Sequence, residues 1–407
     1  MKGVISRMLS ARGRHISFHT PGHKRRGKDI TELSYSDNLA SPTGVLAAAQ
    51  AEIAAILGAD ASFITTDGSS SGVYAMLHAL KRAGVERLAV PISSHVSVLR
   101  GCELTGLVVV PVVQEKSGGF FRQPTQEAVA AALKGADALL LTSPDYYGFF
   151  PDFEQILPLL TRQNKPLVID GAHGAHLHGT PLYAGNFAQM WVDGVHKSLP
   201  AMTQGAVVSA KGEWAARLKE SIVYFRTTSP SYPIMESIEY AVRYPRNERI
   251  ERAAQRLKRE TGALDNPDWS KILLPFGEKS GAARRKLERR GVYPEFDDGN
   301  YLMFYLSPAT KMRELRLLKR LVNALARGSV REDAMECGVV TGRTVALSPR
   351  DAIGRTCAVT CGLFPPCMPL VAKGERVSEE AVRRLEGALS VYGLNEGKII
   401  VYEESDA

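Results

Sequence analysis

The first candidate for chemistry is a lysine in an apolar setting. Residues 191–200 place Lys197 after an apolar run and before a segment of small residues. Upstream, residues 166–169 are apolar and are followed by Asp170, and residues 67–72 are rich in glycine and serine. A pyridoxal phosphate site needs a lysine that forms a Schiff base, an acid that keeps the pyridine nitrogen protonated, and a cradle for the phosphate. The sequence therefore predicts such a site at Lys197.

Each of these features also has a plain structural interpretation. Lysine is ordinarily a surface residue, although burial and a neighbouring cation make its amine nucleophilic. Asp170 could cap the helix that follows it, and the serines of residues 67–72 could do the same. Taken one at a time, these alternatives stay open.

Strands and helices alternate along residues 45–209, which favours an α/β fold with a mostly parallel, doubly wound sheet. Strands are expected at residues 62–66, 88–92, 107–113, 138–142, 166–170, 190–192 and 206–209, and helices at residues 45–57, 73–82, 97–104, 125–133 and 153–161. Ligands of such sheets bind beyond the carboxyl ends of the strands. Ser69, Ser70, His95, Asp170 and Lys197 all fall at these ends, so we expect them to meet at one edge.

The rest of the chain has a different texture. Residues 213–260 are largely helical, and the mixed charges of residues 248–260 predict a solvated helix face. From residue 263 a basic helix, a strand and an amphipathic helix predict a smaller α+β domain. Further expected elements are a cysteine- and proline-rich segment at residues 358–369 and a helix at residues 378–389. The predicted division is an N-terminal arm at 1–45, a cofactor-binding large domain at 46–262 and a C-terminal small domain at 263–407.

Composition narrows the class of protein. The 407 residues are 44% hydrophobic and 23% charged, with a net charge of +8, but the basic residues alternate with acids, so no nucleic-acid partner is expected. Five cysteines, an odd number, and no secretory signal predict a cytoplasmic protein. No stretch of about 18 apolar residues predicts a membrane span.

A metal site is the main rival interpretation. His173, His176 and His178 follow Asp170 closely, and such residues can ligate zinc or iron. A metal hydrolase would leave Lys197 and the serine turn without a role, so no metal is expected. His95 could be a core histidine, or its ring could lie on the pyridine face.

Several motifs together are specific to one family. They are residues 18–24, 29–33, 67–72, 94–95, 100–101, 143–148, 170–176, 196–204 and 227–232. With them the chain resembles the Orn/Lys/Arg decarboxylases, and is most similar to the short Gram-positive type. The resemblance implies the aspartate-aminotransferase-like fold (fold type I) and a homodimer or higher homo-oligomer with the site at the subunit interface. It also implies decarboxylation of arginine, lysine or ornithine, in polyamine biosynthesis or acid resistance.

The resemblance also implies roles for individual residues. Lys197 carries the cofactor, His95 stacks on its ring, and Asp170 pairs with the pyridine nitrogen; these three form the catalytic set. Ala172 and His173 lie beside the cofactor. The residues expected at the phosphate are Gly68, Ser69, Ser70 and His196, with Thr228 reaching it in the partner subunit.

The sequence departs from the family pattern at three places. Gly194 and Val195 stand where the family usually has Ser-Thr, which removes one phosphate hydroxyl. Asp145 stands where a threonine is common, and residues 364–369 differ from the usual Tyr-Pro-Pro-Gly-Ile-Pro. Because the last segment helps to shape the substrate pocket, two alternatives stay open: another pyridoxal phosphate lyase or aldolase, and a cofactor-binding regulator without turnover. Glu295, Asp297 and Asp298 are candidates for contact with a distal cation of the substrate, and a solvated loop is the alternative that stays open.

Overall fold

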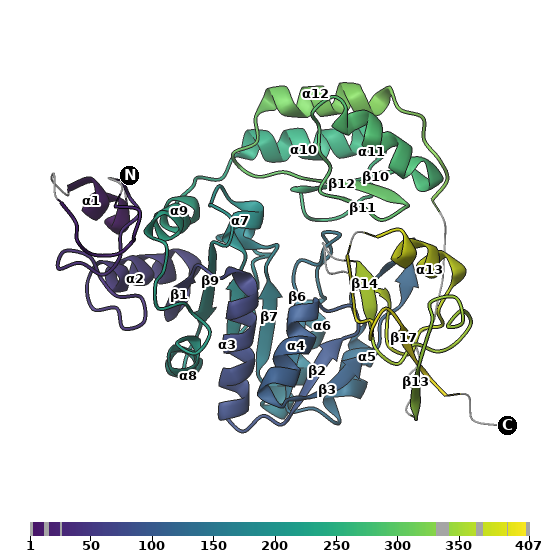
Figure 1. Ribbon diagram of the computed structural model, residues 1–407, viewed down its shortest axis with the longest axis horizontal. Coiled ribbons are helices and arrows are strands. Elements are labelled where there is room, and N and C mark those ends of the chain that lie inside the picture. Colours follow the sequence, from purple (N-terminus) through teal and green to yellow (C-terminus); the bar gives the residue numbers. More distant parts are fainter. Residues whose placement is uncertain are drawn as a thin grey trace.

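A seven-stranded sheet is the centre of the protein, with the strand order β1-β9-β8-β7-β6-β2-β3 (Figure 1). The computed structural model describes residues 3–11, 16–24, 27–330, 342–363, 369–388 and 390–403. The strands are β1 (Ala61–Thr65), β2 (Arg87–Pro91), β3 (Val108–Val112), β6 (Ala138–Thr142), β7 (Leu167–Gly171), β8 (Met190–Asp193) and β9 (Ala206–Ala210). β9 is antiparallel to both of its neighbours, and the other pairings in this sheet are parallel, as predicted.

Helices cover both faces of this sheet because side chains along each strand alternate between the faces. Leu139 and Leu141 of β6 pack into one core cluster, and Ala138 and Leu140 pack into the cluster on the other face. The first face carries α2 (Val45–Leu57), α5 (Gln126–Leu133), α6 (Phe153–Gln163) and α9 (Tyr232–Val242), and the second carries α3 (Gly68–Arg82), α4 (Val96–Thr105) and α8 (Trp214–Ile222). This layering confirms the predicted α/β class.

Short helical turns connect some strands to the rest of the fold. They are η1 (Ala175–Leu177) after β7, η2 (Ala184–Asn186) before β8 and α7 (Val195–Ser198) after β8. At the N-terminus, α1 (Val4–Ala11) packs against α2 and α9. The buried carboxylate of Glu239 in α9 accepts hydrogen bonds from the first backbone N–H groups of α1, which attaches this helix to the large sheet.

A second unit lies above the carboxyl edge of the large sheet, drawn in green in Figure 1. It contains the antiparallel sheet β10-β12-β11, formed by β10 (Lys271–Pro275), β11 (Phe296–Asp297) and β12 (Tyr301–Tyr305). Its helices are α10 (Glu248–Thr261), α11 (Ser280–Glu288), which η3 (Gly277–Lys279) precedes, and α12 (Met312–Asn323). α10 shares a hydrophobic cluster with β10 and β12, so it packs with this unit. The domain boundaries at 45/46 and 262/263 stay a prediction.

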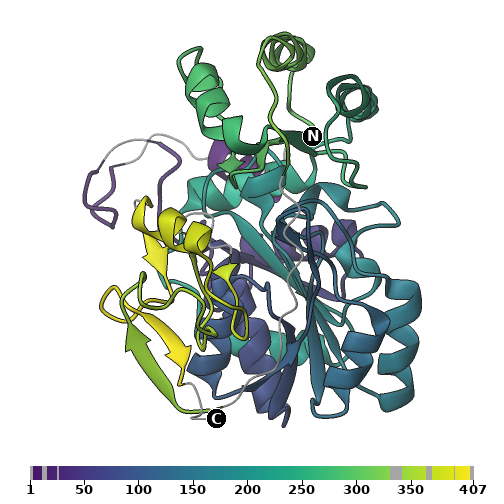
Figure 2. The same ribbon diagram turned by 90° about the vertical axis from the view of Figure 1, so that its right-hand side faces the viewer.

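The C-terminal part packs beside the large sheet (Figure 2). β13 (Thr344–Leu347) pairs with β17 (Ile399–Tyr402), and β14 (Cys361–Leu363) lies between β15 (Pro369–Val371) and β16 (Val391–Tyr392). α13 (Glu379–Glu386) packs on these strands. A hairpin of β4 (Lys116–Ser117) and β5 (Phe120–Phe121) contacts this part through an ion pair of 2.8 Å between Lys116 and Glu375. Residues 364–368 and Leu389, which belong to the predicted C-terminal segments, lie outside the described residues.

The predicted solvated face of residues 248–260 is wrong at Lys258. Its side chain is buried and its ammonium donates to the carbonyl oxygens of Asn266 (3.0 Å) and Asp268 (2.7 Å). Mixed charge alone could not identify a lysine that finds acceptors in the loop after its own helix. Across the residues described above, no helix combines the length and the apolar character needed to cross a membrane.

Candidate active site

One cavity at the carboxyl edge of the large sheet gathers six of the predicted site residues. Ser69, His95, Asp170, Ala172, His173 and Lys197 line it. The other lining residues are Pro91, Ser93, Ser97, Gln114, Phe121, Gln123, Thr142, Asp145, Tyr146, Tyr147 and Pro369. Side chains from separate segments meet here because the parallel strands that precede them end at the same edge.

Lys197 lies in the short helix α7, directly after β8. Its Nζ is 3.4 Å from Nε2 of His173. The His173 ring is packed edge-on against the rings of Tyr146 and Tyr305, with centroid distances of 5.2 and 5.6 Å. Burial, together with the charge of Lys197, holds the pKa of His173 well below its usual range. A neutral imidazole therefore lies beside the lysine amine.

Asp170 is buried near the end of β7, with 4% of its surface exposed. The N–H of Ala172 donates to its Oδ1 at 3.1 Å, which fixes the orientation of the carboxylate. Thr142 of β6 and Val192 of β8 are its register partners, so the acid lies in the middle of the sheet edge. A buried carboxylate of this kind suits a cationic pyridine nitrogen, because burial strengthens the attraction between the two charges.

His95 is the N-cap residue of α4. Its Nδ1 accepts the N–H of Ser97 at 3.1 Å and lies 2.8 Å from the Ser97 hydroxyl, which fixes the plane of the ring. Burial lowers the pKa of His95, although the nearby Asp170 opposes this shift. A neutral aromatic ring of fixed orientation is suitable for stacking on a pyridine ring.

The glycine- and serine-rich segment forms the first turn of α3 rather than a loop before it. Helix α3 begins at Gly68, five residues earlier than predicted, so Ser69 and Ser70 lie inside the helix. Gly68 has a φ of +79°, and its N–H donates to the carbonyl of Gln204 at 3.0 Å. Ser69 lines the cavity at the positive end of the helix, where unpaired N–H groups attract anions.

The lining residues do not include Gly68, Ser70, His196 or Thr228. Nδ1 of His196 lies 3.0 Å from the carbonyl oxygen of Gly205. Thr228 is exposed, and the adjacent Thr227 donates its N–H to Asp67 at the start of α3. The roles of these residues at a phosphate therefore stay predictions.

The histidines of the rival metal interpretation have different partners. His176 lies 2.9 Å from Asp268 of the second unit, and His178 lies 2.8 Å from the carbonyl oxygen of Ala175. Within the described part of the chain, no three His, Cys, Asp or Glu residues are grouped so that they could hold a metal ion.

Two departures from the family pattern have a physical explanation. A Cβ atom at position 194 would lie 2.4 Å from the carbonyl oxygen of Ala172, so the backbone leaves room only for glycine. Asp145 accepts the N–H groups of Tyr147 and Phe149 at 2.9 Å and the Gln123 amide at 3.1 Å. Burial raises the pKa of Asp145 to about 6, so this carboxyl changes charge near neutral pH.

Sequence reasoning gave no role to several residues of the cavity wall. Tyr146 donates its phenol to Glu295 at 3.4 Å, and Tyr147 donates to Asp298 at 3.0 Å. The carboxylate of Asp297 instead accepts the N–H of Gly299. The Tyr146-Tyr147 pair directly after Asp145 was the available signal, because two adjacent aromatic residues just past a strand end are suited to a pocket wall.

The mostly parallel sheet, with a lysine, an aspartate and a histidine at its carboxyl edge, defines an aspartate-aminotransferase-like α/β protein of fold type I. The sequence model of the Orn/Lys/Arg decarboxylase major domain matches residues 26–263. The chain belongs to this family, and it is a pyridoxal phosphate-dependent amino-acid decarboxylase.

Similar proteins extend over nearly the whole chain. The uncharacterized protein YaaO of Bacillus subtilis is 25% identical, over 97% of this chain and 97% of its own length. An arginine decarboxylase of Halalkalibacterium halodurans is also 25% identical, over 93% of this chain and 90% of its own. Among solved structures, the lysine decarboxylase LdcF of Francisella novicida aligns with a TM-score of 0.72 at 15% identity. That alignment covers 98% of this chain and 81% of the other, and it shows a shared fold.

Proposed function

We propose that the protein binds pyridoxal phosphate at Lys197 and decarboxylates arginine, lysine or ornithine to the corresponding amine and CO2. The observation that carries this proposal is the single cavity in which Lys197 contacts His173 while Asp170 and His95 line the same walls. Family membership and a relative named arginine decarboxylase support a basic substrate.

The cavity residues fit the cofactor. When bound, pyridoxal phosphate supplies an aldehyde that condenses with an amine and a ring that accepts the electron pair left by departing CO2. Asp170 would hold a proton at the pyridine nitrogen, and His95 would pack on the ring. Ser69 and the N-terminus of α3 would bind the phosphate.

Lys197 and His173 are placed to handle the remaining proton. Loss of CO2 breaks the bond between the α-carbon and the carboxylate, and the α-carbon must then gain a proton. A proton can pass between Lys197 Nζ and His173 Nε2, which are 3.4 Å apart. We assign the return of the proton to this pair.

Carboxylates behind the tyrosine wall suit a substrate with a distal cation. Glu295 and Asp298 each accept a hydrogen bond from a phenol of the cavity wall, and they flank β11. Arg384 lines a neighbouring pocket together with Asp298. The distal cation of the substrate would therefore compete with the Arg384 guanidinium for the Asp298 carboxylate. The choice among the three substrates rests on this part of the site.

The family resemblance further supports a cytoplasmic homodimer. Thr228 is exposed in the single chain, as a residue that reaches the partner's cofactor would be.

The test is CO2 release by cofactor-loaded protein supplied with each amino acid in turn. Release from one of the three basic amino acids supports the proposal and names the substrate. Lys197→Ala should abolish release and should no longer retain the cofactor covalently after borohydride reduction, as measured by intact mass. Release from no amino acid would contradict the proposal. Other products would favour a different lyase or aldolase, and cofactor retention without any product would favour a regulator.

A further inference from the structure

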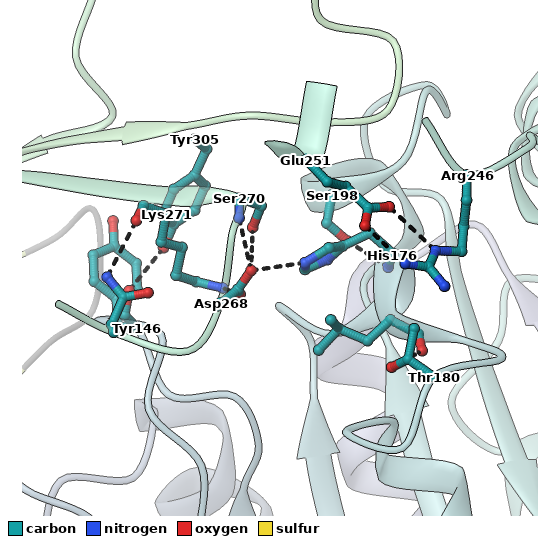
Figure 3. A network of polar contacts seen from close by, with 12 residues as sticks. Tyr146, His176, Thr180, Ser198, Arg246, Glu251, Asp268, Ser270, Lys271 and Tyr305 are labelled. Carbon is teal, nitrogen blue, oxygen red and sulfur yellow. Dashed lines mark hydrogen bonds and ion pairs between the residues drawn. The ribbon is translucent and has the colours of Figure 1, made fainter. Parts of the chain in front are cut away.

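A buried ion pair of the second unit lies against the segment that follows Asp170 (Figure 3). One carboxylate oxygen of Asp268 is 2.9 Å from His176 Nε2, and the other is paired with the ammonium of Lys271. The Asp268 and His176 side chains are 0% exposed, and that of Lys271 is 2% exposed. Because removing charges from water is costly, such a pair is weak evidence for stability and better evidence for a fixed geometry.

The backbone around Asp268 holds the carboxylate in place. Ser270 donates both its N–H (2.9 Å) and its hydroxyl (2.8 Å) to the oxygen that faces His176. The N–H of Asp268 donates to the carbonyl of Gly148, which follows the tyrosines of the cavity wall. Asp268 therefore has little freedom to turn.

From Asp268 one path leads to the lysine-bearing helix. His176 belongs to η1, and its ring packs edge-on against Trp269 at 5.4 Å. The N–H of His176 donates to the hydroxyl of Ser198 at 3.3 Å, and Ser198 follows Lys197 in α7. The ion pair is thus connected to the Lys197 backbone through one histidine and one serine.

A second path leads to the His173 ring. The Lys271 ammonium lies 5.4 Å from the centroid of the Tyr305 ring. Tyr305 packs edge-on against His173, and its hydroxyl donates to the carbonyl of Tyr146 at 3.3 Å. The two paths end on the two partners of the contact between His173 and Lys197.

We infer that Asp268 and Lys271 are positioning residues of the active site. Their ion pair holds η1 against α7 and the His173 ring against the Lys197 amine. The second unit is then part of the site, although it contributes none of the residues expected to touch the cofactor. This inference rests on the proposed attachment of the cofactor to Lys197.

The charge of Lys271 adds an electrostatic effect to the geometric one. Burial is the largest cause of the lowered pKa of His173, and Lys197 and then Lys271 act in the same direction. The charged and titratable groups that face His173 are Lys197 of α7, Lys271 of β10, His95 before α4 and Asp268 before β10, with Tyr146 and Tyr305 packed on the ring. When both charges of the ion pair are removed, Lys197 and His95 still lower the pKa of His173.

The experiment is a double variant, Asp268→Asn with Lys271→Met, which removes both charges and nearly keeps the volume. A single substitution would leave one buried charge unpaired and risks failure to fold. The His173 ring is followed by NMR in cofactor-loaded protein labelled at histidine, and its signal is identified by its loss in His173→Gln. Lys271 lowers the pKa of His173, and Asp268 raises it by a smaller amount, so we expect the pKa of His173 to rise in the double variant. We also expect kcat to fall about tenfold, with KM changed less, because the Lys197 contact is loosened.

Ile272→Ala is the matched control, since Ile272 is an uncharged residue of the same strand that is buried in the hydrophobic cluster of the second unit. It should lower the stability of the second unit and leave the His173 titration unchanged. The same His173 titration in the double variant as in wild type would overturn the inference and leave the ion pair a purely structural feature. The titration needs no turnover, so its outcome is separate from whether CO2 is released.

Discussion

At the scale of single residues, close contacts decide which side chains the site accepts. Gly194 is an example. The family usually has a hydroxyl residue at this place, and the family pattern therefore suggests that phosphate binding is weaker here. The carbonyl of Ala172 occupies the space that any side chain at this position would need.

We therefore expect Gly194→Ser to weaken cofactor binding rather than improve it. Overpacking a tight site costs about 1–3 kcal/mol of unfolding free energy. Urea denaturation and cofactor titration measure the two effects. Gly27→Ser is the control, since a Cβ there meets no atom within 4 Å. Tighter cofactor binding by a stable Gly194→Ser protein would show that the absent hydroxyl is the real defect.

Asp193 makes stability depend on pH. It is buried at the end of β8, where Tyr183 (2.6 Å) and Trp191 (3.1 Å) both donate to its Oδ2. Burial raises the pKa of Asp193 from 3.8 to about 7. Between these two pH values the folded protein binds more protons at Asp193 than the unfolded chain does. The stability that the protonated Asp193 contributes is therefore present in full below pH 3.8 and is lost as the pH rises through 7.

Asp193→Asn removes this dependence. Relative to wild type, the unfolding free energy of the variant should gain roughly 4 kcal/mol between pH 4 and pH 8, because one pKa unit corresponds to about 1.4 kcal/mol. Urea denaturation across that range measures the difference. The exposed Asp265→Asn is the control, and an Asp193→Asn profile that matches the control at every pH would refute the assignment.

At the scale of elements, buried polar groups attach helices that the large sheet does not hold. Helix α1 depends on Glu239 of α9, which accepts the N–H groups of Ile5 (3.2 Å) and Ser6 (3.3 Å). These are first-turn donors with no partner inside their own helix.

Glu239→Ala should release α1 from the large sheet. The loss of a buried acceptor costs about 1–3 kcal/mol, and residues 3–11 should then be cleaved faster by protease. Limited proteolysis with mass analysis of the fragments measures the rate. Glu236→Ala, which removes the ion pair with Lys28 from the same helix, is the control. Equal cleavage rates in the two variants would show that Glu239 does not attach the arm.

At the scale of the whole molecule, the proposed dimer determines whether the site is complete. Tyr224 is 68% exposed and lies four residues before Thr228, which is expected to reach the partner's phosphate. A large exposed aromatic residue next to a predicted interface is suited to subunit contact.

Tyr224→Asp should give monomers that bind the cofactor more weakly. A buried charge at an interface typically costs several kcal/mol, so sedimentation velocity should show a clear shift in mass. Tyr293→Asp, at a 74% exposed position in the second unit, should remain dimeric. A dimer with full cofactor affinity in Tyr224→Asp would place the interface elsewhere.

Some of these features follow from local sequence. The strand at residues 138–142 was predicted at its observed bounds because its apolar run is short and bounded by turn residues. Helix α2 was also predicted at its observed bounds, since Gly58 ends it in a left-handed conformation. The start of α3 was predicted too late, because serines favour caps over helix interiors and tertiary packing overrides that preference.

The sequence by itself determined the α/β class, the family and the gathering of His95, Asp170 and Lys197 at one sheet edge. Periodicity and strand ends are local properties, and parallel strands bring their ends together. The tertiary structure alone decided that Lys258, Asp268 and Lys271 are buried and that Tyr305 packs on His173. The contacts of His176 with Asp268 and of His173 with Tyr305 join residues about 90 to 130 positions apart, and a lone charged residue in a sequence carries no sign of the partner that will neutralise it.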